Sequence, residues 1–113
     1  MHHPNRLGSL RKQWKLSHEE LANLLGYRFK SAICRVEADE RPPTIQFALA
    51  CEVVFGECPR EIFPALYAAV EEDVMRNAAK LDEVLRHDYS HDANVKRSLL
   101  GEMTKRAGKE TRA

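Results

Sequence analysis

The sequence has no long hydrophobic run, no secretory signal pattern and no paired cysteine motif. A membrane-spanning helix needs about 20 consecutive apolar residues, and no stretch approaches that length. Cys34, Cys51 and Cys58 are odd in number and show no C-x-x-C spacing. This cysteine pattern favours reduced thiols over a disulfide framework, so the sequence predicts a cytoplasmic protein without a membrane partner.

The chain also has little net charge: 18 Lys and Arg nearly balance 17 Asp and Glu, which leaves +1. Three regions differ, however. Residues 1–60 carry nine cations and seven carboxylates (+2), residues 61–95 carry three and eight (−5), and residues 96–113 carry six and two (+4). Attraction to a polyanion is therefore plausible only for the two ends of the chain.

The motifs of catalysis are missing too: there is no glycine-rich phosphate loop, no G-x-S-x-G and no H-E-x-x-H. His87 and His91 lie four residues apart and are followed by Asp88 and Asp92, but no third ligand stands at a recognisable spacing. The sequence accordingly predicts no enzyme, no metal site, no cofactor and no small-molecule effector.

What the sequence does contain is a pair of helical patterns between Leu16 and Glu40. Ser17 and Glu20 have the spacing of a capping box, and Gly26 provides a left-handed stop. A second helix is expected over residues 28–38. Its inward face would hold Phe29, Ala32, Ile33 and Val36, and its outward face Lys30, Ser31, Cys34 and Arg35.

In isolation, Lys30 and Arg35 would be ordinary solvated charges. Their order in the chain favours another interpretation, because a capped helix, a glycine turn and a helix with a basic face follow one another directly. Two small residues and two cations on one face suit a helix that enters a groove lined with hydrogen-bond acceptors.

These residues resemble the helix-turn-helix of lambda-repressor-like (Cro/CI, Xre-type) transcriptional regulators. The resemblance lies in Leu16-Ser17-x-Glu19-Glu20-Leu21-Ala22-x-Leu24-Leu25-Gly26, in Ile33-x-Arg35-Val36-Glu37 and in Arg41-x-Pro43, and it continues to Phe63. The family usually has Gln where this chain has His18, and one residue fewer between Gly26 and Ile33. The resemblance implies an all-α fold with a five-helix DNA-binding domain over residues 1–63.

The resemblance also implies double-stranded DNA as the partner. The helix over residues 28–38 would read the major groove, with Lys30, Ser31, Cys34 and Arg35 at the base edges. Phosphate contacts are expected from Ser17 and His18 at a helix start, and from Arg28, Arg41 and Lys12. Bound to DNA, such a protein would be associated with the nucleoid.

Three further helices are expected to support this pair. The first covers residues 5–14 and turns Leu7, Leu10 and Trp14 inward, leaving Arg6, Arg11, Lys12 and Lys15 outside. Thr44 caps a helix over residues 45–55 that is apolar almost all round and so needs cover on two sides. A short fifth helix begins at Cys58-Pro59 and ends at Phe63-Pro64.

A long amphipathic helix then runs from Ala65 to about His87, within an expected segment 64–88. Its apolar stripe includes Leu66, Val70, Val74, Leu81 and Leu85, which we expect to form a homodimer interface with the same helix of a second copy. The alternative is that this helix folds back over the fourth helix. Residues 89–113 are expected to form a flexible basic tail, which either attracts phosphates or only aids solubility.

Taken together, the pattern favours a dimeric, sequence-specific DNA-binding repressor. The competing interpretation is a protein-interaction module, antitoxin-like or a regulatory subunit, that keeps the same fold and acts through the long acidic helix. Steep salt dependence of duplex binding would favour the first, and stoichiometric capture of a protein the second.

Overall fold

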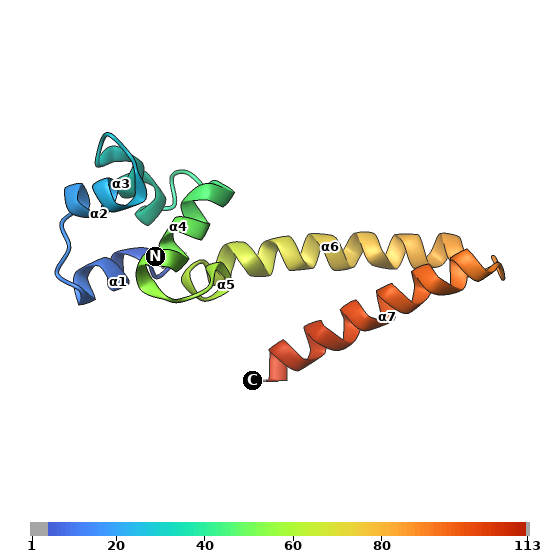
Figure 1. Cartoon of the computed structure of the whole chain (residues 1–113). Coiled ribbons are helices and arrows are strands. Elements are labelled where there is room, and N and C mark those ends of the chain that lie inside the picture. Colours follow the sequence, from blue (N-terminus) through green and yellow to red (C-terminus); the bar gives the residue numbers. More distant parts are fainter. Residues whose placement is uncertain (1–4, 113) are drawn as a thin grey trace. The chain divides into compact units, whose positions relative to one another are not determined.

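The computed structural model of the protein describes residues 5–112, with side chains described as far as residue 108. Seven helices and no strand occur in this part of the chain, so the predicted all-α class is confirmed (Figure 1). The helices are α1 (Leu7–Gln13), α2 (His18–Leu25), α3 (Ser31–Glu37), α4 (Ile45–Phe55), α5 (Pro59–Ile62), α6 (Pro64–Leu85) and α7 (His91–Arg112).

The chain divides into two compact units, Met1–Ala69 and Val70–Ala113, here named the N-terminal unit and the C-terminal unit. The division falls inside α6, whereas the sequence analysis placed boundaries after residues 63 and 88. Residues 1–4 of the predicted domain and residue 113 of the predicted tail lie outside the described residues.

The starts of α2 and α4 are capped by the side chains that the sequence predicted. The Ser17 hydroxyl accepts from the Glu20 amide at 3.0 Å, and the Ser17 amide donates to Glu20 Oε1 at 2.9 Å. The Thr44 hydroxyl accepts from the Phe47 amide at 3.1 Å, so α4 begins and ends where the sequence predicted. Gly26 ends α2 with a φ of 85°, a left-handed conformation that glycine adopts without strain.

The core of the N-terminal unit draws on all of its first five helices. Pairs in contact are α1 with α3, α2 with α3, α2 with α4, and α4 with α5. Its buried members are apolar, and most of them are large: Leu7, Leu10, Leu21, Ala22, Ile33, Val36, Phe47, Ala48, Cys51, Ile62 and Phe63. The Tyr27 ring packs on Phe47 with 5.4 Å between centroids, which ties the segment after α2 to this core.

The first helix departs from its prediction in two ways. It ends at Gln13, one residue before Trp14, and the Trp14 side chain is 62% exposed instead of facing inward. Arg11, expected outside, is 8% exposed. The reason is the helical repeat: residues 7, 10 and 11 share one face at i, i+3 and i+4, whereas residue 14 follows the last turn.

The C-terminal unit contains the larger correction. Residues His91–Arg112, expected as part of a flexible tail, form the 22-residue helix α7. The Ser90 hydroxyl accepts from the Ala93 amide at 3.2 Å and so caps this helix. Apolar side chains of α6 and α7 pack on each other, with Ala78, Leu85, Ala93 and Leu100 buried and Met103 partly buried.

The α7 helix also changes the outcome for the expected dimer residues. Leu85, expected at a dimer interface, is instead buried in this contact within the chain. Leu66, Val70, Val74 and Leu81 remain exposed in the described structure. None of the helices in the described part of the chain combines the length and apolar character that crossing a bilayer demands.

Candidate nucleic-acid interface

The segment between α2 and α3 turns the chain sharply. After Gly26, the Tyr27 amide donates to the Ala22 carbonyl at 2.8 Å, and the Gly26 amide donates to the Asn23 carbonyl at 3.2 Å. Both carbonyls belong to the last turns of α2, and the Gly26 amide also donates to the Ala22 carbonyl. The turn is thus fixed by the backbone of α2, and it directs residues 27–30 toward the start of α3.

Helix α3 is shorter than expected, with seven residues instead of eleven, but its inward face is largely as predicted. Ala32, Ile33 and Val36 are buried against the N-terminal core. Lys30, Ser31 and Arg35 are exposed and Cys34 is half-buried, so the structure places all four on the opposite side of this helix or at its cap.

Phe29 is the exception among the predicted inward residues. It precedes α3, its side chain is 67% exposed, and the Arg28 guanidinium lies over its ring at 5.8 Å from the centroid. Because residues 28–30 are not helical, the i to i+3 spacing from Phe29 to Ala32 does not put both on one face. Residues 28–30 instead line part of a surface hollow of about 470 Å³. The full lining consists of Glu19, Ala22, Asn23, Arg28, Phe29, Lys30 and Ser31.

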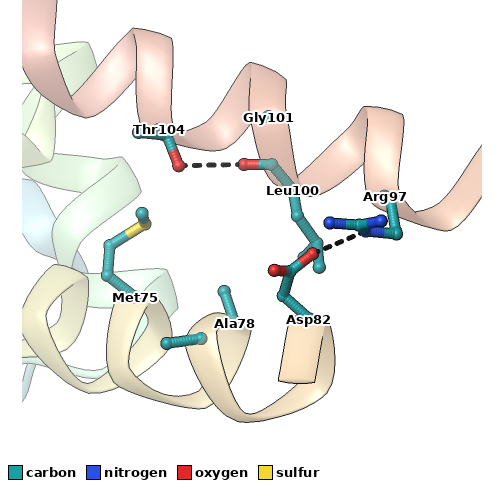
Figure 2. A pocket seen from close by; sticks show the side chains of 8 residues that line it. Met75, Ala78, Asp82, Arg97, Leu100, Gly101 and Thr104 are labelled. Carbon is teal, nitrogen blue, oxygen red and sulfur yellow. Dashed lines mark hydrogen bonds and ion pairs between the residues drawn. The ribbon is translucent and has the colours of Figure 1, made fainter. Parts of the chain in front are cut away.

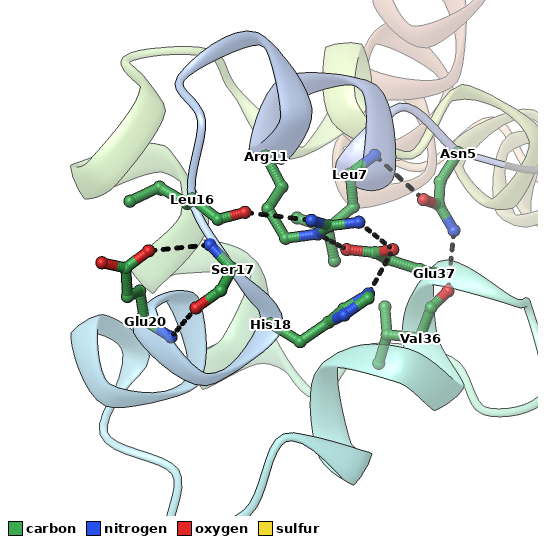
Figure 3. Close-up of polar contacts among 9 residues, drawn as sticks. All are labelled: Asn5, Leu7, Arg11, Leu16, Ser17, His18, Glu20, Val36 and Glu37. Atoms are coloured by element: carbon green, nitrogen blue, oxygen red, sulfur yellow. Dashed lines mark hydrogen bonds and ion pairs between the residues drawn. The ribbon is translucent and has the colours of Figure 1, made fainter.

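One carboxylate, Glu37, joins the first three helices at the end of α3 (Figure 3). Arg11 of α1 donates from Nε to Glu37 Oε2 at 2.6 Å and from Nη2 to Glu37 Oε1 at 3.3 Å. His18 of α2 places Nε2 at 3.2 Å from Glu37 Oε1; since a carboxylate only accepts, this contact needs a proton on Nε2. The orientation of α3 is therefore fixed by charge as well as by its apolar face.

Two further bonds complete this junction. Arg11 Nη1 donates to the Leu16 carbonyl at 3.0 Å, and Asn5 Nδ2 donates to the Val36 carbonyl at 2.9 Å. Helix α1 also approaches Glu37 closely at Gly8, where an added Cβ would lie 3.2 Å from Glu37 Oε1. A side chain at position 8 would therefore push against the carboxylate that holds α1 and α3 together.

The five residues expected at phosphates occupy different environments. Lys12, Arg28 and Arg41 are exposed. The Ser17 hydroxyl and amide are both engaged with Glu20, and the His18 ring is engaged with Glu37. Of these five residues, Lys12, Arg28 and Arg41 are therefore exposed cations that could reach a phosphate. Ser17 instead caps α2, and His18 contacts Glu37 of α3.

Sequence reasoning missed Arg11, Asn5 and Glu37 as the residues that position α3. The signal for Arg11 was present, because its spacing from Leu7 and Leu10 matches an inward face. A buried cation requires a partner, and Glu37 near the end of the predicted second helix was an available carboxylate. Asn5 gave no such signal, since it precedes α1 and bonds to a backbone carbonyl.

The thiols differ in environment. Burial raises the pKa of Cys51 to about 12, while Cys34 beside the outward residues of α3 is half-buried. Within the described residues, no three His, Cys, Asp or Glu side chains are grouped as a metal site would require. His87 and His91 are both exposed.

Comparison with known proteins gives no relative from which a role could be transferred: no family model, no curated protein and no solved structure matches the chain.

Proposed function

We propose that the protein is a sequence-specific, double-stranded DNA-binding transcriptional regulator of the lambda-repressor-like helix-turn-helix class, and that α3 enters the major groove. The observation that carries this proposal is the two-sided character of α3. Its apolar face is anchored in the N-terminal core, while Lys30, Ser31 and Arg35 are exposed and Cys34 is half-buried beside them. A helix about 10–12 Å wide fits the major groove of B-DNA when its outward side chains are accessible.

The roles of the four outward residues follow from their chemistry. Arg35 is suited to a bidentate contact with guanine O6 and N7, and Lys30 to a base edge or the adjacent phosphate. The Ser31 hydroxyl both donates and accepts, and Cys34 is small enough to lie against a thymine methyl group. Arg28, Lys12 and Arg41 would contact phosphates, which fix orientation without reading sequence.

Selection of duplexes from a randomised DNA pool by the full-length protein tests the proposal. We expect enrichment of one motif, present as an inverted repeat because the protein acts as a homodimer on two half-sites. Binding should weaken steeply as salt rises. Recovery of unselected sequence, or binding insensitive to salt, would refute the proposal.

The variant Arg35→Ala tests the reading role of α3. We expect a loss of about 1–3 kcal/mol in affinity for the selected duplex and little change on random duplex, because a bidentate base contact is sequence-specific. Lys80→Ala is the matched control, since it removes an exposed cation from α6. Equal losses on both duplexes would assign Arg35 to a phosphate instead.

The variants Lys12→Ala and Arg41→Ala test the phosphate roles. Each should weaken binding to all duplexes uniformly and reduce the slope of log K against log salt by about one. A loss confined to the selected duplex would contradict a phosphate role for either residue.

One observation supports the competing function of a protein-interaction module. Several large apolar side chains of α4 are exposed in the described structure, namely Ile45, Leu49 and Val53. A partner protein that covers this face, or the acidic side of α6, would make the same fold an interaction module. Stoichiometric capture of one such protein, without any enrichment of DNA sequence, would favour it.

A further inference from the structure

The contact between α6 and α7 has a thin core. Its buried members are two alanines and two leucines, Ala78, Leu85, Ala93 and Leu100, with Met103 beside them. Helices in water depend on the burial of an apolar face for most of their stability. Two helices of 22 residues that share so few bulky side chains leave most of that stabilisation to another contact.

One side of this helix pair is apolar and uncovered. Successive residues of a helix are rotated by about 100°, so Val70, Val74, Leu81 and Val84 of α6 lie on one flank of the line through Ala78 and Leu85. On α7, Leu99, Met103 and Val95 lie on one flank of the line through Ala93 and Leu100, and the exposed Lys96 lies among them. Because the two helices run antiparallel, these flanks form the same side of the pair, which we name the bundle face.

The side of the helix pair opposite the bundle face differs from it in shape and in polarity. A hollow of about 400 Å³ lies there, lined by residues of the other flanks, among them Met75, Ala79 and Gly101. Figure 2 shows Met75 and Gly101 beside it. It is also closed by an ion pair, in which Arg97 Nε donates to Asp82 Oδ1 at 2.9 Å. This side thus has its own polar contact, while the bundle face has large apolar side chains.

We propose that the bundle face is occupied by a second copy of the chain, so that two α6–α7 pairs form an antiparallel four-helix bundle. In this bundle, α6 of one copy packs beside α7 of its partner. The proposal deepens the homodimer of the proposed function and rests on that function for its role, but it requires no DNA.

The exposed area fits such a partner. The exposed fractions of the six leucine and valine side chains run from 44% for Leu81 to 76% for Val84. Together they amount to about 500 Å² of apolar surface, a substantial share of the roughly 800 Å² that each partner of a standard interface buries. Exposed apolar surface of this extent on one side is at the upper end of what a monomer shows.

Charge selects the pairing of helices. The α6 helix carries five carboxylates and two cations, a balance of −3, and residues 91–108 of α7 carry four cations and two carboxylates, a balance of +2. If α6 packed beside α6 of the partner, two acidic helices would face each other. A two-fold axis parallel to the helices instead brings each α6 beside α7 of the partner and alternates the sign of charge around the bundle.

The first test measures the mass of the full-length protein in solution by sedimentation equilibrium, without DNA, at several protein concentrations. We expect a dimer for the native chain and a monomer for Leu81→Glu and for Leu99→Glu, because each places a carboxylate in the bundle face. Ala69→Glu is the matched control, since it introduces the same residue on α6 at an exposed position that the helical repeat places opposite the contact with α7, and it should remain dimeric.

A native chain that is monomeric at every concentration would overturn the proposal. So would dimers that persist in both leucine variants with helix content preserved. If instead the variants lose helix content, cross-linking of conservative variants decides the question. Protein carrying Leu81→Cys is mixed with protein carrying Leu99→Cys, allowed to exchange subunits and oxidised.

Leu81 and Leu99 lie at the same level of the helix pair, so the proposed bundle predicts disulfides mainly between the two different variants. The native chain, with its own three cysteines, is the background control. Disulfides mainly between two copies of the Leu81→Cys variant would overturn the pairing of α6 with α7. Because DNA is absent from these measurements, their failure would leave DNA binding by the N-terminal unit to be judged separately.

Discussion

The two units of the chain differ in how completely each buries its own apolar side chains. The N-terminal unit closes a core of leucine, isoleucine and phenylalanine contributed by five short helices. The C-terminal unit has two of the longest helices but buries chiefly alanine and leucine between them. The length of a helix therefore does not indicate how completely its apolar side chains are buried within the unit. The short helices are fixed by caps, turns and a shared carboxylate, whereas the long ones leave several valine and leucine side chains exposed.

The largest expected effect comes from removing the carboxylate that joins three helices. Glu37→Ala should lower the free energy of unfolding by about 3–5 kcal/mol, because it leaves the Arg11 guanidinium buried without its partner. The side chains of this pair are only 9% and 14% exposed. Urea unfolding followed by circular dichroism measures the loss.

Glu72→Ala is the matched control in the acidic helix, since Glu72 pairs with Arg76 at the surface. Its expected cost is close to zero, in line with exposed ion pairs. The double variant Arg11→Met/Glu37→Leu should regain most of the lost stability. A cost for Glu37→Ala no larger than that for Glu72→Ala would show that the junction does not stabilise the N-terminal unit.

Truncation of one leucine in each unit compares their cores directly. Leu10→Ala should cost roughly 3 kcal/mol, because the side chain is fully surrounded, and Leu100→Ala roughly half of that, because Leu100 borders the hollow beside α7. Hydrogen exchange of amides in α1 and in α7, at one protein concentration, assigns each loss to its unit. Equal losses would mean that the C-terminal core is as well packed as the other.

Replacing a glycine by alanine should change the free energy of unfolding in opposite directions in the two units. Gly26→Ala should destabilise by about 1 kcal/mol, because the position needs a φ of 85°. Gly101→Ala should stabilise by about 0.5–1 kcal/mol, because the residue lies inside α7 and an added Cβ meets nothing within 4 Å. Thermal unfolding of the two variants measures the difference. A loss of stability in Gly101→Ala would indicate that the helix pair requires a glycine there.

The smallest effect concerns the buried thiol. Since burial raises the pKa of Cys51 to about 12, the unfolded chain ionises first as pH rises. Cys51 therefore stabilises the fold fully below its usual pKa, near 9, and this contribution is lost as pH rises toward 12. In Cys51→Ala, the decline of stability over that alkaline range should be shallower. At lower pH, a thiol reagent should modify Cys34 and Cys58 but spare Cys51, as mass spectrometry would show.

Much of the N-terminal unit could be predicted from local signals. Ser17 with Glu20, Thr44, Gly26 and Gly56 define helix ends through bonds within a few residues, so their sequence spacing carries the information. The C-terminal helix was missed because Gly101 and the many polar residues lowered its apparent helical pattern. Ser90 as a cap and the repeat Ala93, Leu100 were signals that could have revealed it.

The candidate interface was predictable only in part. The outward positions of α3 followed from the helical repeat, but its start depends on how residues 27–30 follow the turn. That path is set by contacts such as Tyr27 on Phe47, which are distant in sequence. The contact of His18 with Glu37, and the burial of Arg11, likewise join separate helices. Local spacing indicates the inward position of Arg11, but it does not indicate which residue of another helix Arg11 or His18 would contact.

The close approach of Gly8 to Glu37 has an evolutionary consequence. Positions 8 and 37 share one small volume, so substitution at one restricts what is tolerated at the other. Homologous chains that keep the long acid at 37 should retain glycine at 8, and those with a bulkier residue at 8 should carry a shorter side chain at 37. The two positions should therefore covary across homologues, although they lie 29 positions apart in the sequence.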